Sequence, residues 1–239
     1  LPYAKAAAVV LKAFAGAELT DSEAERLCTE AYASFADPAV TPLRQIEDDL
    51  YILELFHGPT LAFKDIALQL IGKLFDWALT RKGERRTVIA ATSGDTGGAA
   101  AGALAGLSAV DLFVLYPAGR ISEVQRRFMT TTGQANIHAI EIDGSFDDAQ
   151  AIMKTMLADR ALTVKAQLSA VNSVNWLRVA AQTVYYFATI AKLDKAPVFT
   201  IPSGNLGDAL AGFVAHQMGL PASRFVIATN SNDILSRAL

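Results

Sequence analysis

The chain has 239 residues, of which 19% are charged and 52% apolar, so it is long and apolar enough for a sizeable core and is not a disordered chain. The formal net charge is −3, so the chain lacks the excess of positive charge that is typical of proteins that bind nucleic acids, and no nucleic-acid partner is expected. The single cysteine, Cys28, excludes an internal disulfide or a cysteine zinc cage. With no secretory signal evident, we expect a cytoplasmic protein.

The first part of the chain, residues 1–37, is predicted to be mostly helical. Residues 4–15 are rich in alanine, and residues 21–35 follow a Thr20 cap signal, so both are expected to form helices. A strand is predicted over 51–56. The apolar spacing of 63–79 then predicts a helix whose N-terminus carries Lys64.

From residue 87 onward, short strands and helices alternate. Strands are predicted at 87–92, 110–116, 136–142, 197–201 and 224–229, and helices at 95–106, 121–131, 146–158, 174–192 and 205–218. Such alternation predicts an α/β fold with open parallel sheets flanked by helices. Gly98, Gly102 and Gly106 have the spacing of a membrane-helix packing motif, but the alanine-rich stretch around them favours a buried soluble helix, so no membrane partner is expected.

Two strand-to-helix turns share the frame S-G-[DN]-x-G-x-A-x-A-G, which we interpret as one local solution used twice. They begin at Ser93 and at Ser203. Glycines let the backbone approach a ligand, and free N–H groups at a helix start attract an anion. The alternative is that the glycines only permit close packing of helix and strand. Neither turn is a Walker A loop or a dinucleotide fingerprint.

Lys64 lies within the apolar stretch LFHGPTLAFKDIALQ. Burial and a helix N-terminus both disfavour an ammonium group and lower a lysine pKa, which suits an amine that forms a Schiff base. The alternative is a surface lysine in a first helical turn, paired with Asp65 or with a solvated carboxylate. An aldehyde cofactor that carries a phosphate would need both the amine and an anion-binding turn. No cluster of side chains has metal-ligand spacing, so no metal is expected.

Four segments in this order, ELFHGPTLAFKDIALQ, ATSGDTGGAA, NSVNWLRVAAQTVYY and IPSGNLGD, resemble the threonine synthase family of the bacterial and fungal kind. The resemblance implies the pyridoxal-phosphate fold of the tryptophan-synthase-β type (fold type II), incomplete at its C-terminus. It also implies a partial N-terminal helical region at 1–40, a large cofactor-binding domain at 41–85 and 170–239, and a small substrate domain at 86–169.

The resemblance implies a role for each matching residue. Lys64 would hold pyridoxal 5'-phosphate as a Schiff base and act as the catalytic base. The cofactor phosphate would be bound by Ser203, Gly204, Asn205, Leu206, Gly207 and Asp208. The substrate would be bound by Ser93, Gly94, Asp95, Thr96 and Gly97 at its carboxylate, and by Asn172, Ser173 and Arg178 at its phosphate. For Arg178 the alternative is a solvated arginine on a long helix.

The family's reaction converts O-phospho-L-homoserine and water into L-threonine and phosphate, as a lyase acting in threonine biosynthesis. Other readings are a different enzyme of the same fold, such as a serine/threonine dehydratase or a phospho-amino-acid lyase, or a non-catalytic phosphate-ligand-binding protein. The partner of the pyridine nitrogen is not identified in this chain. A monomer or homodimer is expected.

Overall fold

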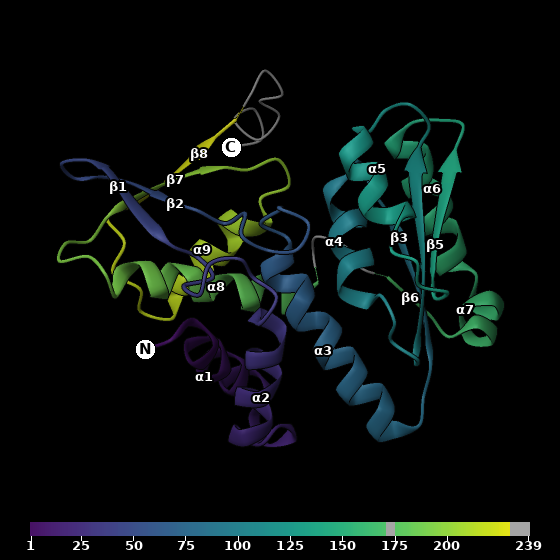
Figure 1. Ribbon diagram of the computed structural model, residues 1–239, viewed down its shortest axis with the longest axis horizontal. Helices are drawn as coiled ribbons and strands as arrows, with labels where there is room; N and C mark the ends of the chain where they lie inside the picture. The colour runs from purple at the N-terminus through teal and green to yellow at the C-terminus, as the bar shows by residue number, and fades with distance from the viewer. Residues whose placement is uncertain (171–174, 230–239) are drawn as a thin grey trace.

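The computed structural model describes residues 1–170 and 175–229. One half of the molecule, at the right of Figure 1, is built around a four-stranded parallel sheet. The order of the strands is β5-β4-β3-β6. They comprise β3 (Arg86–Ala91), β4 (Val110–Pro117), β5 (Ile137–Ile142) and β6 (Leu168–Ala170). The predicted parallel α/β architecture is therefore confirmed.

Helices cover both faces of this sheet because the strands are apolar on both sides. Val88 and Val114 face a core shared with α4 (Asp95–Leu104) and α5 (Glu123–Thr130). Ile89 and Leu115 face Ala149 and Met153 of α6 (Phe146–Ala158) on the other side. A further short helix, α7 (Arg160–Ala166), leads from α6 into β6. Continuous apolar strands are expected when a parallel sheet is buried on both faces.

Helix α3 (Asp65–Lys82) joins the two halves of the molecule (Figure 1). Its first two turns are buried on all sides, with Ile66 and Leu70 in one core and Leu68 and Ile71 in the other. A Cβ on Gly72 would lie 2.4 Å from the carbonyl oxygen of Ala103, so α3 and α4 touch almost backbone to backbone. This close crossing explains the small residues of α4. The burial of this helix was predicted from its sequence.

The other half contains the remaining elements. Its helices are α1 (Tyr3–Ala15), a 3₁₀ turn at Gly16–Glu18, α2 (Asp21–Tyr32), α8 (Trp176–Ile190) and α9 (Gly207–Gln217). The antiparallel hairpin β1 (Leu43–Glu47) and β2 (Leu50–Leu53) and the parallel pair β7 (Val198–Pro202) and β8 (Arg224–Ala228) complete it. The predicted Thr20 cap is confirmed as a full capping box with Glu23.

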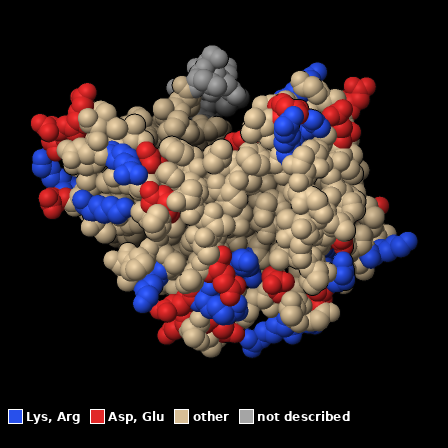
Figure 2. Space-filling model, in the orientation of Figure 1, with Lys and Arg blue, Asp and Glu red and all other residues tan. Residues whose placement is uncertain are grey.

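Strands β1 and β6 and helix α7 were not predicted from the sequence. Four of the five residues of β1 are exposed, so it shows no apolar alternation, and β6 has only three residues. The strand expected over 51–56 is shorter, at Leu50–Leu53. No helix in the described part of the chain is long and apolar enough to cross a membrane. On the face shown in Figure 2, charged side chains of both signs gather around the rim.

Candidate active site

Lys64 occupies the N-cap position of α3, as predicted, and its side chain is 17% exposed. Its Nζ donates to Oδ2 of Asp95 at 3.1 Å and lies 4.8 Å from the centre of the Phe63 ring. The expected alternative, a pairing with Asp65, is wrong, because Asp65 accepts hydrogen bonds from Thr60 instead. The lysine therefore reaches across from α3 to the first residue of α4.

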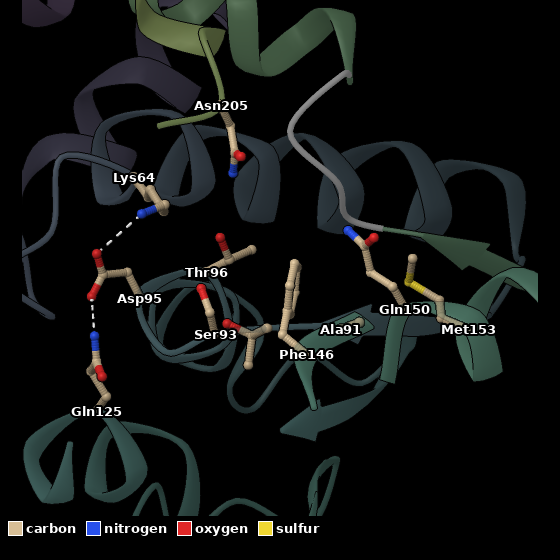
Figure 3. Close-up of a pocket in the computed structure, with 11 residues that line it drawn as sticks. Lys64, Ala91, Ser93, Asp95, Thr96, Gln125, Phe146, Gln150, Met153 and Asn205 are labelled. Carbon is tan, nitrogen blue, oxygen red and sulfur yellow. Dashed lines mark hydrogen bonds and ion pairs between the residues drawn. The ribbon is translucent and has the colours of Figure 1, made fainter. Parts of the chain in front are cut away.

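Asp95 is held from both sides. Gln125 Nε2 donates to Oδ1 of Asp95 at 2.7 Å, while Lys64 binds the other carboxylate oxygen (Figure 3). Partial burial acts to raise the pKa of Asp95, but the hydrogen bond from Gln125 and the charge of Lys64 outweigh it and hold the pKa below its ordinary value. Asp95 is therefore maintained as a carboxylate beside the lysine.

In the first glycine turn, between β3 and α4, two backbone N–H groups donate hydrogen bonds to Thr92, a residue that was not predicted from the sequence to belong to the site. Thr92 is 1% exposed, and its Oγ1 accepts from the backbone N–H of Gly94 at 3.0 Å and of Gly97 at 2.9 Å. These two N–H groups are thus already engaged. The side chains of Ser93 and Thr96 point into the pocket described below (Figure 3).

The second turn, between β7 and α9, is open. Ser203 donates to Asp208, and Asp208 Oδ1 also accepts from the N–H of Ala209 at 2.9 Å. Within residues 1–170 and 175–229, none of the backbone N–H groups from Gly204 to Asp208 has a recorded acceptor. A Cβ on Gly204 would meet nothing within 4 Å. This row of free donors at the start of α9 is the arrangement that binds a phosphate.

The two turns therefore differ more than their shared sequence frame predicted. The positive φ falls on Gly94 in the first turn, at 138°, and on Leu206 in the second, at 55°. A Cβ on Gly94 would lie 2.3 Å from Cδ of Gln125, whereas Gly204 faces open space. Our interpretation of one local solution used twice is wrong, because neighbouring elements restrict the two backbones differently.

One pocket brings together residues from five parts of the chain (Figure 3). Of the predicted site residues, Lys64, Ser93, Asp95, Thr96 and Asn205 line it. The rest of the lining was not predicted from the sequence and consists of Ala91, Thr92, Gln125, Phe146, Gln150 and Met153. The last three come from α6, and nothing in its sequence pattern marks them apart from ordinary amphipathic positions.

Arg178 lies in the first turn of α8 and is 3% exposed, so the alternative of a solvated arginine is wrong. In the described part of the chain its Nε and Nη1 have no hydrogen-bond partner. Burial lowers the pKa of its guanidinium group. Arg178 is not among the described residues that line the Lys64 pocket. Asn172 and Ser173, the other expected ligands of the substrate phosphate, lie outside the described residues.

A family model described as "Pyridoxal-phosphate dependent enzyme" matches residues 37–239. The chain belongs to this family of pyridoxal-phosphate dependent enzymes. A threonine synthase of Pseudomonas aeruginosa is 48% identical over 240 residues, covering 99% of this chain and 51% of its own length. For a threonine synthase of Saccharomyces cerevisiae the identity is 46%, over 93% of this chain and 46% of the relative.

Among solved structures, a threonine synthase of Brucella melitensis with bound pyridoxal phosphate superposes with a TM-score of 0.93 at 49% identity. That match covers 99% of this chain and 52% of the solved chain. The predicted fold class and the membership in a pyridoxal-phosphate family are thereby confirmed. The chain spans about half the length of the curated relatives it matches.

The donor set of the pocket fits the cofactor of the family. A lysine amine and Asn205 of the open loop face the same pocket, and the loop beside them offers a row of N–H groups that have no acceptor in the described part of the chain. An aldehyde that carries a phosphate needs an amine for its carbonyl and a concave set of donors for its anion. Lys64 and the 203–208 loop supply both.

Proposed function

We propose that this chain forms part of a threonine synthase, a lyase that converts O-phospho-L-homoserine and water into L-threonine and phosphate. The observation that carries the proposal is that Lys64 and Asn205 of the open 203–208 loop face one pocket. The threonine synthases that match almost the whole chain at 46–49% identity support the choice of reaction.

In the proposed site, Lys64 has two roles. Bound pyridoxal phosphate supplies a carbonyl carbon that links to amines and a ring that takes up electrons from the substrate's α-carbon. Lys64 Nζ would hold the cofactor at this carbonyl, and the same amine would act as the general base that removes the proton at the substrate's α-carbon. The N–H groups from Gly204 to Asp208 would hold the cofactor phosphate at the positive end of α9, while Ser203 fixes the loop through Asp208.

The substrate would be held at two ends. Its carboxylate would meet the hydroxyl groups of Ser93 and Thr96 and the backbone N–H groups at the start of α4. The N–H groups of Gly94 and Gly97 are not available to the substrate, because both donate to Thr92 Oγ1. These two glycines would instead shape the turn. Asp95 would contribute its N–H rather than its carboxylate, because two anions repel each other.

The phosphate of the substrate would be bound by Arg178 together with Asn172 and Ser173. A guanidinium group matches a phosphate dianion with paired N–H donors, and Arg178 has two nitrogen atoms without a described partner. We also propose the division into an N-terminal region at 1–40, a cofactor domain at 41–85 and 170–239, and a substrate domain at 86–169. The protein would act in the cytoplasm, as a monomer or homodimer.

The test uses the full-length protein with pyridoxal phosphate and a panel of O-phospho-L-homoserine, L-serine and L-threonine. We expect equal amounts of phosphate and threonine from the first substrate. Formation of 2-oxo acids from serine or threonine, with no phosphate release, would identify a dehydratase instead. Lys64→Ala should abolish turnover and borohydride fixation of the cofactor, whereas Lys154→Ala, on the exposed surface of α6, should change neither.

A further inference from the structure

Gln125 links the start of α5 to Asp95, the residue that pairs with Lys64. It is the third residue of α5, and its Oε1 accepts from the N–H of Ser122 at 3.0 Å while its own N–H donates to Ser122 Oγ at 3.2 Å. This capping box fixes the glutamine side chain to the start of its helix. The side-chain amide nitrogen of Gln125, Nε2, donates to Asp95 (Figure 3).

The surrounding backbone leaves Gln125 little freedom. Gly94 precedes Asp95, and a Cβ there would lie within 2.5 Å of Cδ, Nε2 and Oε1 of Gln125. The amide group of Gln125 therefore packs directly on the backbone of the first glycine turn. This contact limits the movement of the amide while it donates to Asp95.

A chain of contacts thus runs from the cap of α5 to the amine. Ser122 fixes Gln125, Gln125 donates to Oδ1 of Asp95 at 2.7 Å, and Oδ2 accepts from Lys64 Nζ at 3.1 Å. Lys64 and Asp95 are the two charged groups among the described residues that line the pocket. The neighbouring carboxylate of Asp65 is directed at Thr60.

We propose that Gln125 is a positioning residue that orients the Asp95 carboxylate toward Lys64, and so sets how firmly Lys64 Nζ is held in the ion pair and how readily it reacts. The importance of that amine rests on the proposed function, but the positioning can be measured without cofactor or substrate. With its carboxylate fixed, Asp95 keeps Lys64 Nζ in the ion pair at 3.1 Å. When the hydrogen bond from Gln125 is removed, the carboxylate can turn to solvent, and Nζ is released from the ion pair.

The experiment measures the acylation of Lys64 by acetic anhydride as a function of pH, resolved by peptide mass spectrometry, with exposed Lys154 as the internal reference. In Gln125→Ala, we expect the midpoint of the pH profile to fall by about 0.5–1 pH unit, which raises the rate near pH 8 about three- to tenfold. Greater access alone would multiply the rate equally at every pH.

Gln125→Glu gives the opposite test. It keeps an oxygen atom that accepts from Ser122 N–H, so the capping box is retained, and it adds a negative charge beside the ion pair. The midpoint should then rise and the rate at pH 8 should fall. Gln150→Ala removes an amide at the other end of the pocket in Figure 3 and should leave the midpoint of Lys64 where it is in the wild type.

An unchanged midpoint in Gln125→Ala, or a shift of the same sign in Gln125→Ala and Gln125→Glu, would overturn the proposal. Circular dichroism on each variant checks that the fold is kept, and Gln125→Glu remains informative if the alanine variant does not fold. Because the reagent is not the cofactor, the labelling result holds even if turnover of O-phospho-L-homoserine is not found. The two proposals can therefore fail separately.

Discussion

Asp65 and Thr60 lock the loop that presents the lysine. The carboxylate of Asp65 accepts the backbone N–H of Thr60 at 2.8 Å and its hydroxyl group at 2.6 Å, and Asp65 is fully buried. A Cβ on Gly58 would lie 2.4 Å from Cβ of Asp65, so the loop before α3 closes tightly over this side chain. Lys64 therefore projects from a turn that its own neighbour in the sequence holds in place.

Asp65 should make the stability of the protein depend on pH. Burial raises its pKa above the ordinary value of 3.8, although the hydrogen bonds from Thr60 act in the opposite direction. The folded state then binds the proton of Asp65 more tightly than the unfolded state does. The contribution of Asp65 to the free energy of unfolding is therefore present below about pH 3.8 and is lost as the pH rises through the folded-state pKa. Relative to Asp65→Asn, the free energy of unfolding of the wild type should fall across that range.

Urea unfolding of both proteins at a series of pH values checks this prediction. Asp194→Asn, at an exposed position, supplies a control whose difference from the wild type should stay nearly constant. A wild type that gains stability over Asp65→Asn as the pH rises would mean that the hydrogen bonds from Thr60 outweigh the cost of burying the charge.

Thr92→Val should destabilise the protein while preserving its volume. The valine removes the acceptor of the Gly94 and Gly97 N–H groups, which leaves buried donors unsatisfied at a cost of about 1–3 kcal/mol. Thr189→Val is the matched control. Its hydroxyl is a donor to the carbonyl oxygen of Tyr185, so valine there leaves no backbone N–H without an acceptor. Chemical denaturation measures both, and equal losses would contradict the proposed role of Thr92.

Alanine should destabilise the protein at the first glycine turn and have little effect at the second. Gly94→Ala places a side chain at a φ of 138° and against Gln125, and we expect a loss of at least about 2 kcal/mol from backbone strain and overpacking. Gly204→Ala meets open space without a positive φ, so the fold should be retained within about 0.5 kcal/mol. Similar losses of unfolding free energy in the two variants would show that the turns are equivalent after all.

Arg178→Met should stabilise the protein. Methionine retains much of the buried volume and removes a guanidinium group whose Nε and Nη1 have no partner in the described part of the chain. Replacement of a buried charge that has no partner among residues 1–170 and 175–229 by an apolar side chain should raise the free energy of unfolding by about 1–3 kcal/mol. Arg224→Met, on the exposed strand β8, should have little effect. Marked destabilisation of Arg178→Met would reveal a structural partner for the guanidinium.

The elements with strong local signals were predicted well. Helix α6 has the predicted bounds, and β3, β4 and β5 start and end within one residue of their predicted positions, because buried apolar runs and cap residues act over a few neighbours. The hairpin strand β1 and the short β6 were missed. Their residues form strands because of the partners they pair with, which adjacent residues do not reveal.

The sequence by itself determined the α/β architecture, the place of Lys64 at the start of α3, and the two glycine turns after strands. Only the tertiary structure decided which groups these features meet. It directed Lys64 to Asp95 rather than to the adjacent Asp65, placed Gln125 beside Asp95 from 30 residues away, and engaged one turn through Thr92 while the other stayed open. The reason is physical: local propensity depends on neighbouring residues, whereas the charge and the hydrogen bonds around an amine depend on how separate elements pack.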